Sequence, residues 1–93
     1  MKIKPTEIKE SWKTGSLNPG LTVEDINTAL GFGPNMDDDP IKVKYYWGFK
    51  ARIPSFKKGK SEWVECAIWD YKGVRWSTFG PLTVFKTLFP KHC

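Results

Sequence analysis

Apolar and polar residues alternate almost throughout the stretch from residue 42 to residue 53. Successive side chains of a strand point to opposite faces, so this pattern predicts a strand with one buried face and one basic, solvent-facing face. The expected buried residues are Val43, Tyr45, Trp47, Phe49, Ala51 and Ile53. The expected outward residues are Lys42, Lys44, Tyr46, Lys50 and Arg52.

Two more strands are predicted, over residues 62–71 and 74–79. Pro54 ends the first strand, and Lys72-Gly73 is typical of a tight turn between the second and the third. In the second strand, one set of alternate positions is apolar and the other carries a carboxylate among large aromatic rings. The apolar set is Val64, Cys66 and Ile68, and the mixed set is Trp63, Glu65, Ala67, Trp69 and Tyr71.

Helices are predicted on both sides of these strands. Thr22 and Asp25 form a capping-box pattern, and Gly31 is a typical stop, which together predict a helix over residues 23–30. Gly80-Pro81 begins a last helix, which Pro90 ends. Residues 5–13 fit a short helix and fit equally well an arm that docks through Trp12.

The expected fold class is therefore α+β. A three-stranded antiparallel sheet has one helix before it and one after it, in the order αβββα, with an extra short helix at the N-terminus as an option. A chain of 93 residues is the size of one small domain. We assign residues 1–20 to an arm or short helix and residues 21–93 to a single compact domain.

Charge and aromatic content indicate a class of partner. The chain has a net charge of +5 and a pI near 9.3, and it contains five Trp. Cations beside exposed rings are what single-stranded nucleic acid engages, since phosphates meet Lys and Arg while bases stack on the rings. The predicted binding residues are Lys42, Lys44, Tyr46, Lys50, Arg52, Lys57, Lys58, Lys60, Trp63, Trp69, Tyr71 and Arg75.

Other interpretations of this face stay open. A charged strand face also serves solubility, and the N-terminal segment or Trp12 would then cover the rings as a second small core. A protein partner is a close competitor, because Trp, Tyr and Arg dominate protein interfaces too. Such a contact would use Trp63, Trp69, Tyr71 and the loop from Asp37 to Asp39. Both a monomer and a homodimer fit the sequence.

Catalysis, metal binding and membrane insertion find little support in the sequence. The single His is His92, next to the last residue, so no nucleophile, base and orienting group can be assembled. Asp37, Asp38 and Asp39 are consecutive and lack the alternate spacing of a chelating loop. We expect no enzyme activity, no metal and no cofactor. Cys66 and Cys93 are expected as free thiols of a cytoplasmic protein, without a signal peptide or membrane span.

Three stretches resemble small uncharacterised proteins of phages and mobile elements: residues 21–32, 66–73 and 76–81. The resemblance covers most of the chain after Pro19 and brings no defined catalytic motif. It implies a role in host takeover or counter-defence, as an inhibitor that binds and blocks a host protein such as a nucleic-acid-acting enzyme. The main functional expectation stays a small binding protein that contacts nucleic acid or a nucleoprotein, with single strands favoured.

Overall fold

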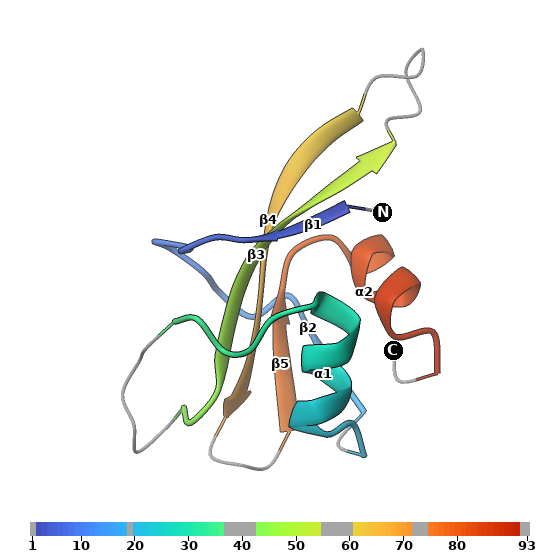
Figure 1. Cartoon of the computed structure of the whole chain (residues 1–93). Helices are drawn as coiled ribbons and strands as arrows, with labels where there is room; N and C mark the ends of the chain where they lie inside the picture. The colour runs from blue at the N-terminus through green and yellow to red at the C-terminus, as the bar shows by residue number, and fades with distance from the viewer. Residues whose placement is uncertain (1, 19, 37–42, 55–60, 72–74, 92–93) are drawn as a thin grey trace.

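The computed structural model describes residues 2–18, 20–36, 43–54, 61–71 and 75–91. An antiparallel sheet of five strands in the order β1-β3-β4-β5-β2 forms the centre of this part of the chain (Figure 1). Its strands are β1 (Lys2–Pro5), β2 (Gly15–Leu17), β3 (Tyr46–Pro54), β4 (Ser61–Tyr71) and β5 (Arg75–Phe79). The two helices are α1 (Val23–Leu30) and α2 (Leu82–Leu88).

The predicted three-stranded sheet is therefore wrong, and so is the optional N-terminal helix. The order α1, β3, β4, β5, α2 agrees with the prediction, but the first 17 residues add one strand to each edge of the sheet. Backbone pairing with β3 and β5 satisfies the N–H and C=O groups of these short segments, which outweighs a marginal helical propensity. The division into an arm and a domain at residue 20 stays a prediction.

The predicted capping of α1 is confirmed. The Thr22 hydroxyl accepts a hydrogen bond from the Asp25 backbone N–H at 3.1 Å, and the Asp25 carboxylate accepts one from the Thr22 N–H at 3.0 Å. Gly31 ends the helix with a φ of 88°, a left-handed conformation that glycine adopts without a steric penalty. The first helix thus begins and ends where local sequence signals place it.

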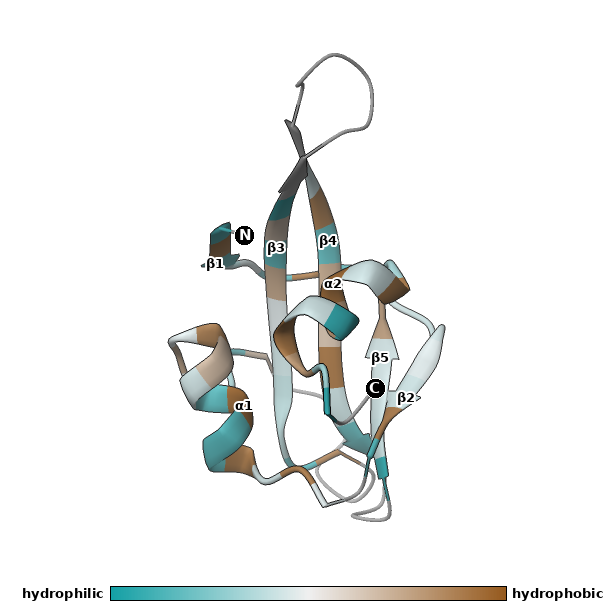
Figure 2. Cartoon of the chain, turned by 90° about the vertical axis from the view of Figure 1, so that its right-hand side faces the viewer, coloured by the Kyte–Doolittle hydropathy of each residue, from teal (hydrophilic) through white to brown (hydrophobic). Residues whose placement is uncertain are grey.

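Both helices cover the same face of the sheet, which we call the helix face (Figure 2). Trp47 and Phe49 of β3 and Cys66 and Ile68 of β4 are fully buried there, as predicted. Ala51 and Val64 also belong to this core, whereas Val43 belongs to a second core and the side chain of Ile53 lies outside the described residues. The Trp47 indole N–H donates to the Asn27 side-chain oxygen of α1 at 3.0 Å. This bond lets a large buried ring pack without leaving its polar group unpaired.

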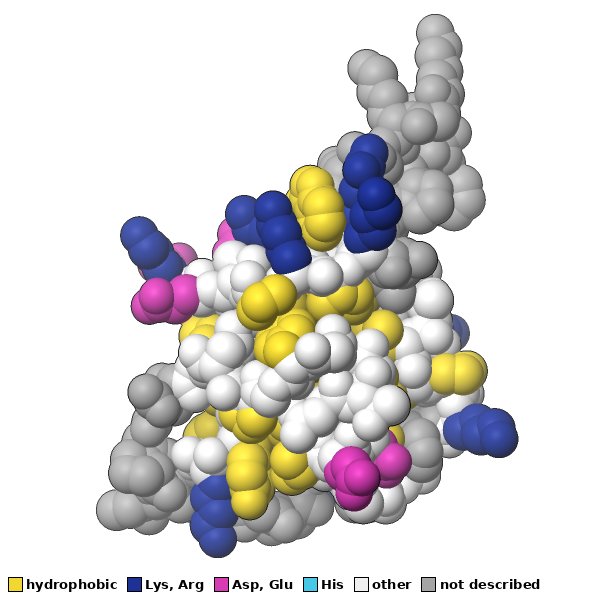
Figure 3. Space-filling model, in the orientation of Figure 1, with side chains coloured by type: hydrophobic (Ala, Val, Ile, Leu, Met, Phe, Trp, Pro, Cys, Tyr) yellow, Lys and Arg dark blue, Asp and Glu magenta, His cyan; other side chains and the backbone are white. Residues whose placement is uncertain are grey.

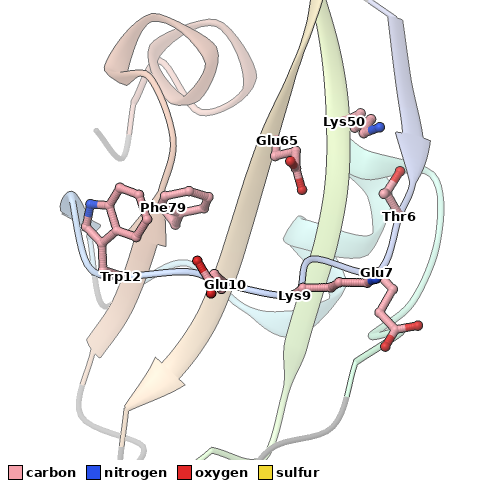
Figure 4. Close-up of a pocket in the computed structure, with 8 residues that line it drawn as sticks. All are labelled: Thr6, Glu7, Lys9, Glu10, Trp12, Lys50, Glu65 and Phe79. Carbon is pink, nitrogen blue, oxygen red and sulfur yellow. The ribbon is translucent and has the colours of Figure 1, made fainter.

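The opposite face is crossed by residues 6–14, which we call the crossing segment. It runs from β1 at one edge to β2 at the other (Figure 4). The Thr6 N–H donates to the Gly48 carbonyl at 3.0 Å, and a Cβ at Gly48 would overlap Met36 and the Thr6 carbonyl oxygen. Glycine is therefore required at the point where the chain passes over β3.

Tyr45 and Tyr46 differ from the predicted exposure. Tyr46 is buried although it lies on the expected face, because the Ser11 hydroxyl hydrogen bonds with its hydroxyl and its ring packs 5.5 Å from that of Trp69. Tyr45 is 40% exposed and precedes the strand. A small second core beneath the crossing segment accounts for the difference. Its members are Val43, Tyr46 and Ala67, with Met36, Trp69 and Phe79 packed against them.

Replacing Trp47 tests the helix-face core. Trp47→Ala should lower the free energy of unfolding by about 3–5 kcal/mol, because it removes a fully buried large ring and leaves a cavity. Urea unfolding measures the change. Trp63→Ala is the matched control, and its partly exposed ring should cost about 1 kcal/mol or less. Equal losses in the two variants would show that the assignment of the faces is wrong.

Adding one methyl group at Gly48 tests the crossing. Gly48→Ala should destabilise the protein by about 1–3 kcal/mol, since the new Cβ meets backbone that has no room to move. The control is Gly33→Ala, where the added methyl group makes only an ordinary contact, 4.0 Å from the Asn27 side-chain oxygen, and φ is not in the left-handed region. Thermal unfolding of both variants measures the effect. A Gly48→Ala protein as stable as the control would contradict the close crossing.

Candidate functional site

The crossing segment leaves free the part of this face that carries its densest positive charge. Register pairs Lys2 of β1 with Arg52 of β3, and Lys4 with Lys50, so all four side chains belong to the same face. We call these four residues the basic patch. Figure 3 shows Lys and Arg side chains gathered where β1 lies in Figure 1. Four cations in two adjacent rows repel one another, which favours an anionic partner.

Trp63 of β4 lies at this patch, directly opposite Arg52 in the register. Its ring is 40% exposed, and the Lys4 ammonium sits 4.5 Å from the ring centroid. A cation over an exposed ring contributes about 0.5–1 kcal/mol. The basic patch therefore lies beside an aromatic ring that only a weak contact with Lys4 covers in part.

A groove of about 500 Å³ runs between the basic patch and the crossing segment (Figure 4). The sheet contributes one residue from each of its three central strands, Lys50, Glu65 and Phe79. The crossing segment contributes Thr6, Glu7, Lys9, Glu10 and Trp12. Trp12 is 63% exposed, and its ring meets that of Phe79 edge-on with 4.7 Å between centroids. The groove thus combines carboxylates and ammonium groups with an exposed ring at one end.

The predicted binding residues do not all meet at this place. Lys50, Arg52 and Trp63 belong to the patch. Lys44 and Arg75 are exposed at the other ends of the strands, while Tyr46 is buried and Trp69 is half-buried beneath the crossing segment. The remaining predicted positions lie outside the described residues or have side chains outside them. They are Lys42, Lys57, Lys58, Lys60 and Tyr71.

Lys2, Lys4 and Glu10 of this region were missed from the sequence, and Trp12 was expected only as a residue that docks the N-terminal arm. The run Lys2-Ile3-Lys4 alternates with a period of two, which is a strand signal, but it is too short to stand out. The structure pairs Ile3 with Ala51 and packs it against the helix-face core, so Lys2 and Lys4 fall on the other face. No local pattern marks Glu10, since its position depends on the path of the crossing segment.

The Asp70 carboxylate and the Cys66 thiol, two groups of kinds that often take part in catalysis or metal binding, have structural roles here. Asp70 is buried, and one of its carboxylate oxygens accepts hydrogen bonds from the backbone N–H groups of Lys44 and Tyr45 at 2.9 and 2.7 Å. It shapes the entry into β3. Cys66 is fully buried, and this burial raises the pKa of its thiol from 9.0 to about 12. A thiol that stays protonated is a poor nucleophile and a poor metal ligand.

The described residues contain no group of three or more His, Cys, Asp or Glu side chains placed to hold a metal ion. Nor does this part of the chain include a helix of the length and apolarity that a membrane span needs. Comparisons with family models, curated proteins and solved structures find no match to this chain. The functional argument therefore rests on the geometry of the sheet face.

The raised pKa of Cys66 gives a prediction with a defined sign. The thiol is neutral in the folded protein, and an unfolded chain ionises it above its ordinary value of about 9. The contribution to stability is therefore complete below that pH and is lost as pH rises toward about 12. In a Cys93→Ser protein, where Cys66 is the only thiol, a disulfide reagent at about pH 8 should react only after denaturation. Rapid labelling of the folded protein would contradict the burial.

Proposed function

We propose that this protein is a non-enzymatic binding protein that contacts single-stranded nucleic acid through the basic patch and Trp63. One observation carries the proposal: cations from two neighbouring strands lie beside an exposed tryptophan ring on the same face. Lys and Arg neutralise phosphates, while an exposed indole accepts a stacked base. Both elements are needed to bind a strand whose bases are unpaired.

Energies favour a base over Lys4 as the partner of the Trp63 ring. Stacking of a base on an aromatic side chain contributes about 1–3 kcal/mol, against about 0.5–1 kcal/mol for an exposed cation–π contact. The Lys4 ammonium then moves from the ring to a phosphate of the bound strand. In the free protein Lys4 contacts a ring that is 40% exposed, and in the complex a base takes the place of Lys4 on that ring.

Single strands suit this surface better than a duplex. The bases of a duplex are stacked on one another, so an indole ring reaches them only after they are unstacked. A single strand presents phosphates and free base faces at the same time. The phosphates can meet the cations of β1 and β3 while a base stacks on Trp63 of the neighbouring strand β4. A duplex would use only the cations, and it should bind more weakly and with less dependence on Trp63.

A second candidate is a phage-type inhibitor that blocks a host protein, such as a nucleic-acid-acting enzyme. The exposed Trp12 and Trp63 rings favour it, because tryptophan is enriched among the residues that dominate protein interfaces. An interface held by buried rings tolerates salt, whereas contacts to phosphates weaken steeply as salt rises. Salt dependence therefore separates the two candidates. In either case we place the protein in the cytoplasm, where free thiols stay reduced.

Fluorescence anisotropy with a labelled thymidine oligonucleotide of about 12 nucleotides tests the proposal. Affinity should fall steeply between about 50 and 200 mM salt, and the matching duplex should bind more weakly. Lys50→Glu should lower affinity at least about tenfold, because it replaces an attraction to phosphate with a repulsion. Lys86→Glu on α2 is the matched control, since its exposed side chain belongs to the helix that covers the opposite face.

Unchanged binding by Lys50→Glu would remove the basic patch from the contact surface. Absence of binding by the unmodified protein at the lower salt concentration would refute nucleic-acid binding itself. A pulldown for a protein target would then be the next experiment.

A further inference from the structure

The groove beside the basic patch contains carboxylates that phosphate binding does not explain. Glu65 of β4 is paired in register with Lys50, and Glu10 lies in front of β4 on the crossing segment (Figure 4). Both line the same groove. Within the described part of the chain, neither carboxylate has a hydrogen bond or an ion pair. Both side chains are exposed, so water hydrates them in the free protein, and a ligand that presents N–H donors can take the place of that water.

The far end of the groove offers a flat apolar surface. The exposed Trp12 ring meets Phe79 there, and Glu10 is two residues before Trp12 on the crossing segment. The volume of about 500 Å³ is larger than a planar bicyclic ring requires. A flat ligand with N–H donors and an attached phosphate fits the ring, the carboxylates and the cations of this groove.

We infer that the groove accepts an unstacked guanine base of the bound strand. This inference rests on the proposed function and names the base that the same surface selects. Guanine presents two adjacent donors, N1–H and the 2-amino group, and a carboxylate accepts both at once through its two oxygens. Adenine and cytosine present one amino group on that edge. Thymine presents a single N–H between two carbonyl oxygens, which the carboxylates repel.

The charge around the groove is mixed. Glu7, Glu10 and Glu65 line it together with Lys9 and Lys50, and Lys4 lies next to it in the register, so an arginine or lysine of a partner would meet ammonium groups as well as carboxylates. A nucleotide divides its charge in the opposite way, with the phosphate toward Lys4 and Lys50 and the neutral base edge toward Glu10 and Glu65. The arrangement of charges in the protein matches this division.

A single-base exchange tests the inference. The thymidine oligonucleotide of about 12 nucleotides is compared with versions that carry one central guanine, hypoxanthine, adenine or cytosine. One guanine should raise affinity about tenfold over thymine, with adenine and cytosine between them. Hypoxanthine keeps N1–H and lacks the amino group, so it should lose most of the gain. A single guanine in a thymidine tract also avoids the four-stranded structures of guanine runs.

Two variants assign the preference to the carboxylates. Glu65→Gln and Glu10→Gln should each reduce the ratio of guanine to thymine affinity at least about threefold, while raising the affinity for every oligonucleotide by removing a negative charge. The ratio is the readout, because a general loss of structure lowers both affinities together. Glu24→Gln on α1 is the matched control and should leave the ratio unchanged.

The outcomes separate this inference from the function on which it rests. Salt-sensitive binding with equal affinity for all central bases would overturn the guanine assignment and leave nucleic-acid binding standing. No binding to any oligonucleotide at low salt would overturn both. Binding of a labelled tetra-arginine peptide that Glu65→Gln abolishes, without any base preference, would assign the groove to a cationic peptide and also overturn the inference.

Discussion

The close approach of the N-terminal segment to β3 at Gly48 is the constraint on which this structure depends. β1 and β2 lie at opposite edges of the sheet, so the residues between them have to cross one of its faces. Helices fill the other face, and the crossing passes so close to β3 that a single Cβ would block it. The Asn35 side chain adds to this junction, since its amide donates to the Gly48 carbonyl and accepts from the Gly48 N–H at 2.9 and 2.8 Å. The Gly48 N–H and carbonyl of β3 thus have hydrogen-bond partners although β1 ends beside Phe49.

The position of the crossing determines what the second face can bind. Toward one end it covers Tyr46 and half-buries Trp69, which removes them from the surface. Toward the other end it leaves the basic patch and Trp63 exposed, and it brings its own Glu10 and Trp12 to the border of that patch. One backbone path therefore creates a small core, a cationic surface and a groove of mixed charge. The proposed function assigns phosphates to the cationic surface and a base to the groove.

The sequence predicts the elements that local signals specify. The capping pair Thr22 and Asp25 locates α1, and the alternation along β3 and β4 assigns Trp47 and Cys66 to the buried face. These features depend on contacts within one element or on a period that the chain itself displays. The path of the first 17 residues depends instead on backbone pairing with strands more than 40 residues away, such as Ile3 with Ala51. A strand of only four residues is too short to show a clear hydrophobic period, and a period does not indicate which strand it pairs with.

In the candidate site too, strand alternation predicts some residues and the path of the crossing segment determines others. Lys50, Arg52 and Trp63 were predicted because they lie on one phase of long strands, and the structure brings them together with Lys2 and Lys4. Tyr46 has the predicted phase but not the predicted exposure, because phase gives the face and says nothing of what crosses it. The carboxylate of Glu65 repels phosphates, so it does not contribute to binding of a nucleic-acid backbone. It lines the same groove as Trp12, and we propose that its partner there is the edge of a base.

The most direct test of this account uses the five tryptophan indole N–H signals in a two-dimensional NMR titration with the guanine-containing oligonucleotide. Trp47 and Trp76 are buried and donate to Asn27 and to the Leu21 carbonyl, so their signals should stay in place. Signals of Trp63 and Trp12 should shift together as the oligonucleotide is added. Shifts of the buried pair with none at Trp63 and Trp12, or no shift of any indole, would contradict binding at this face.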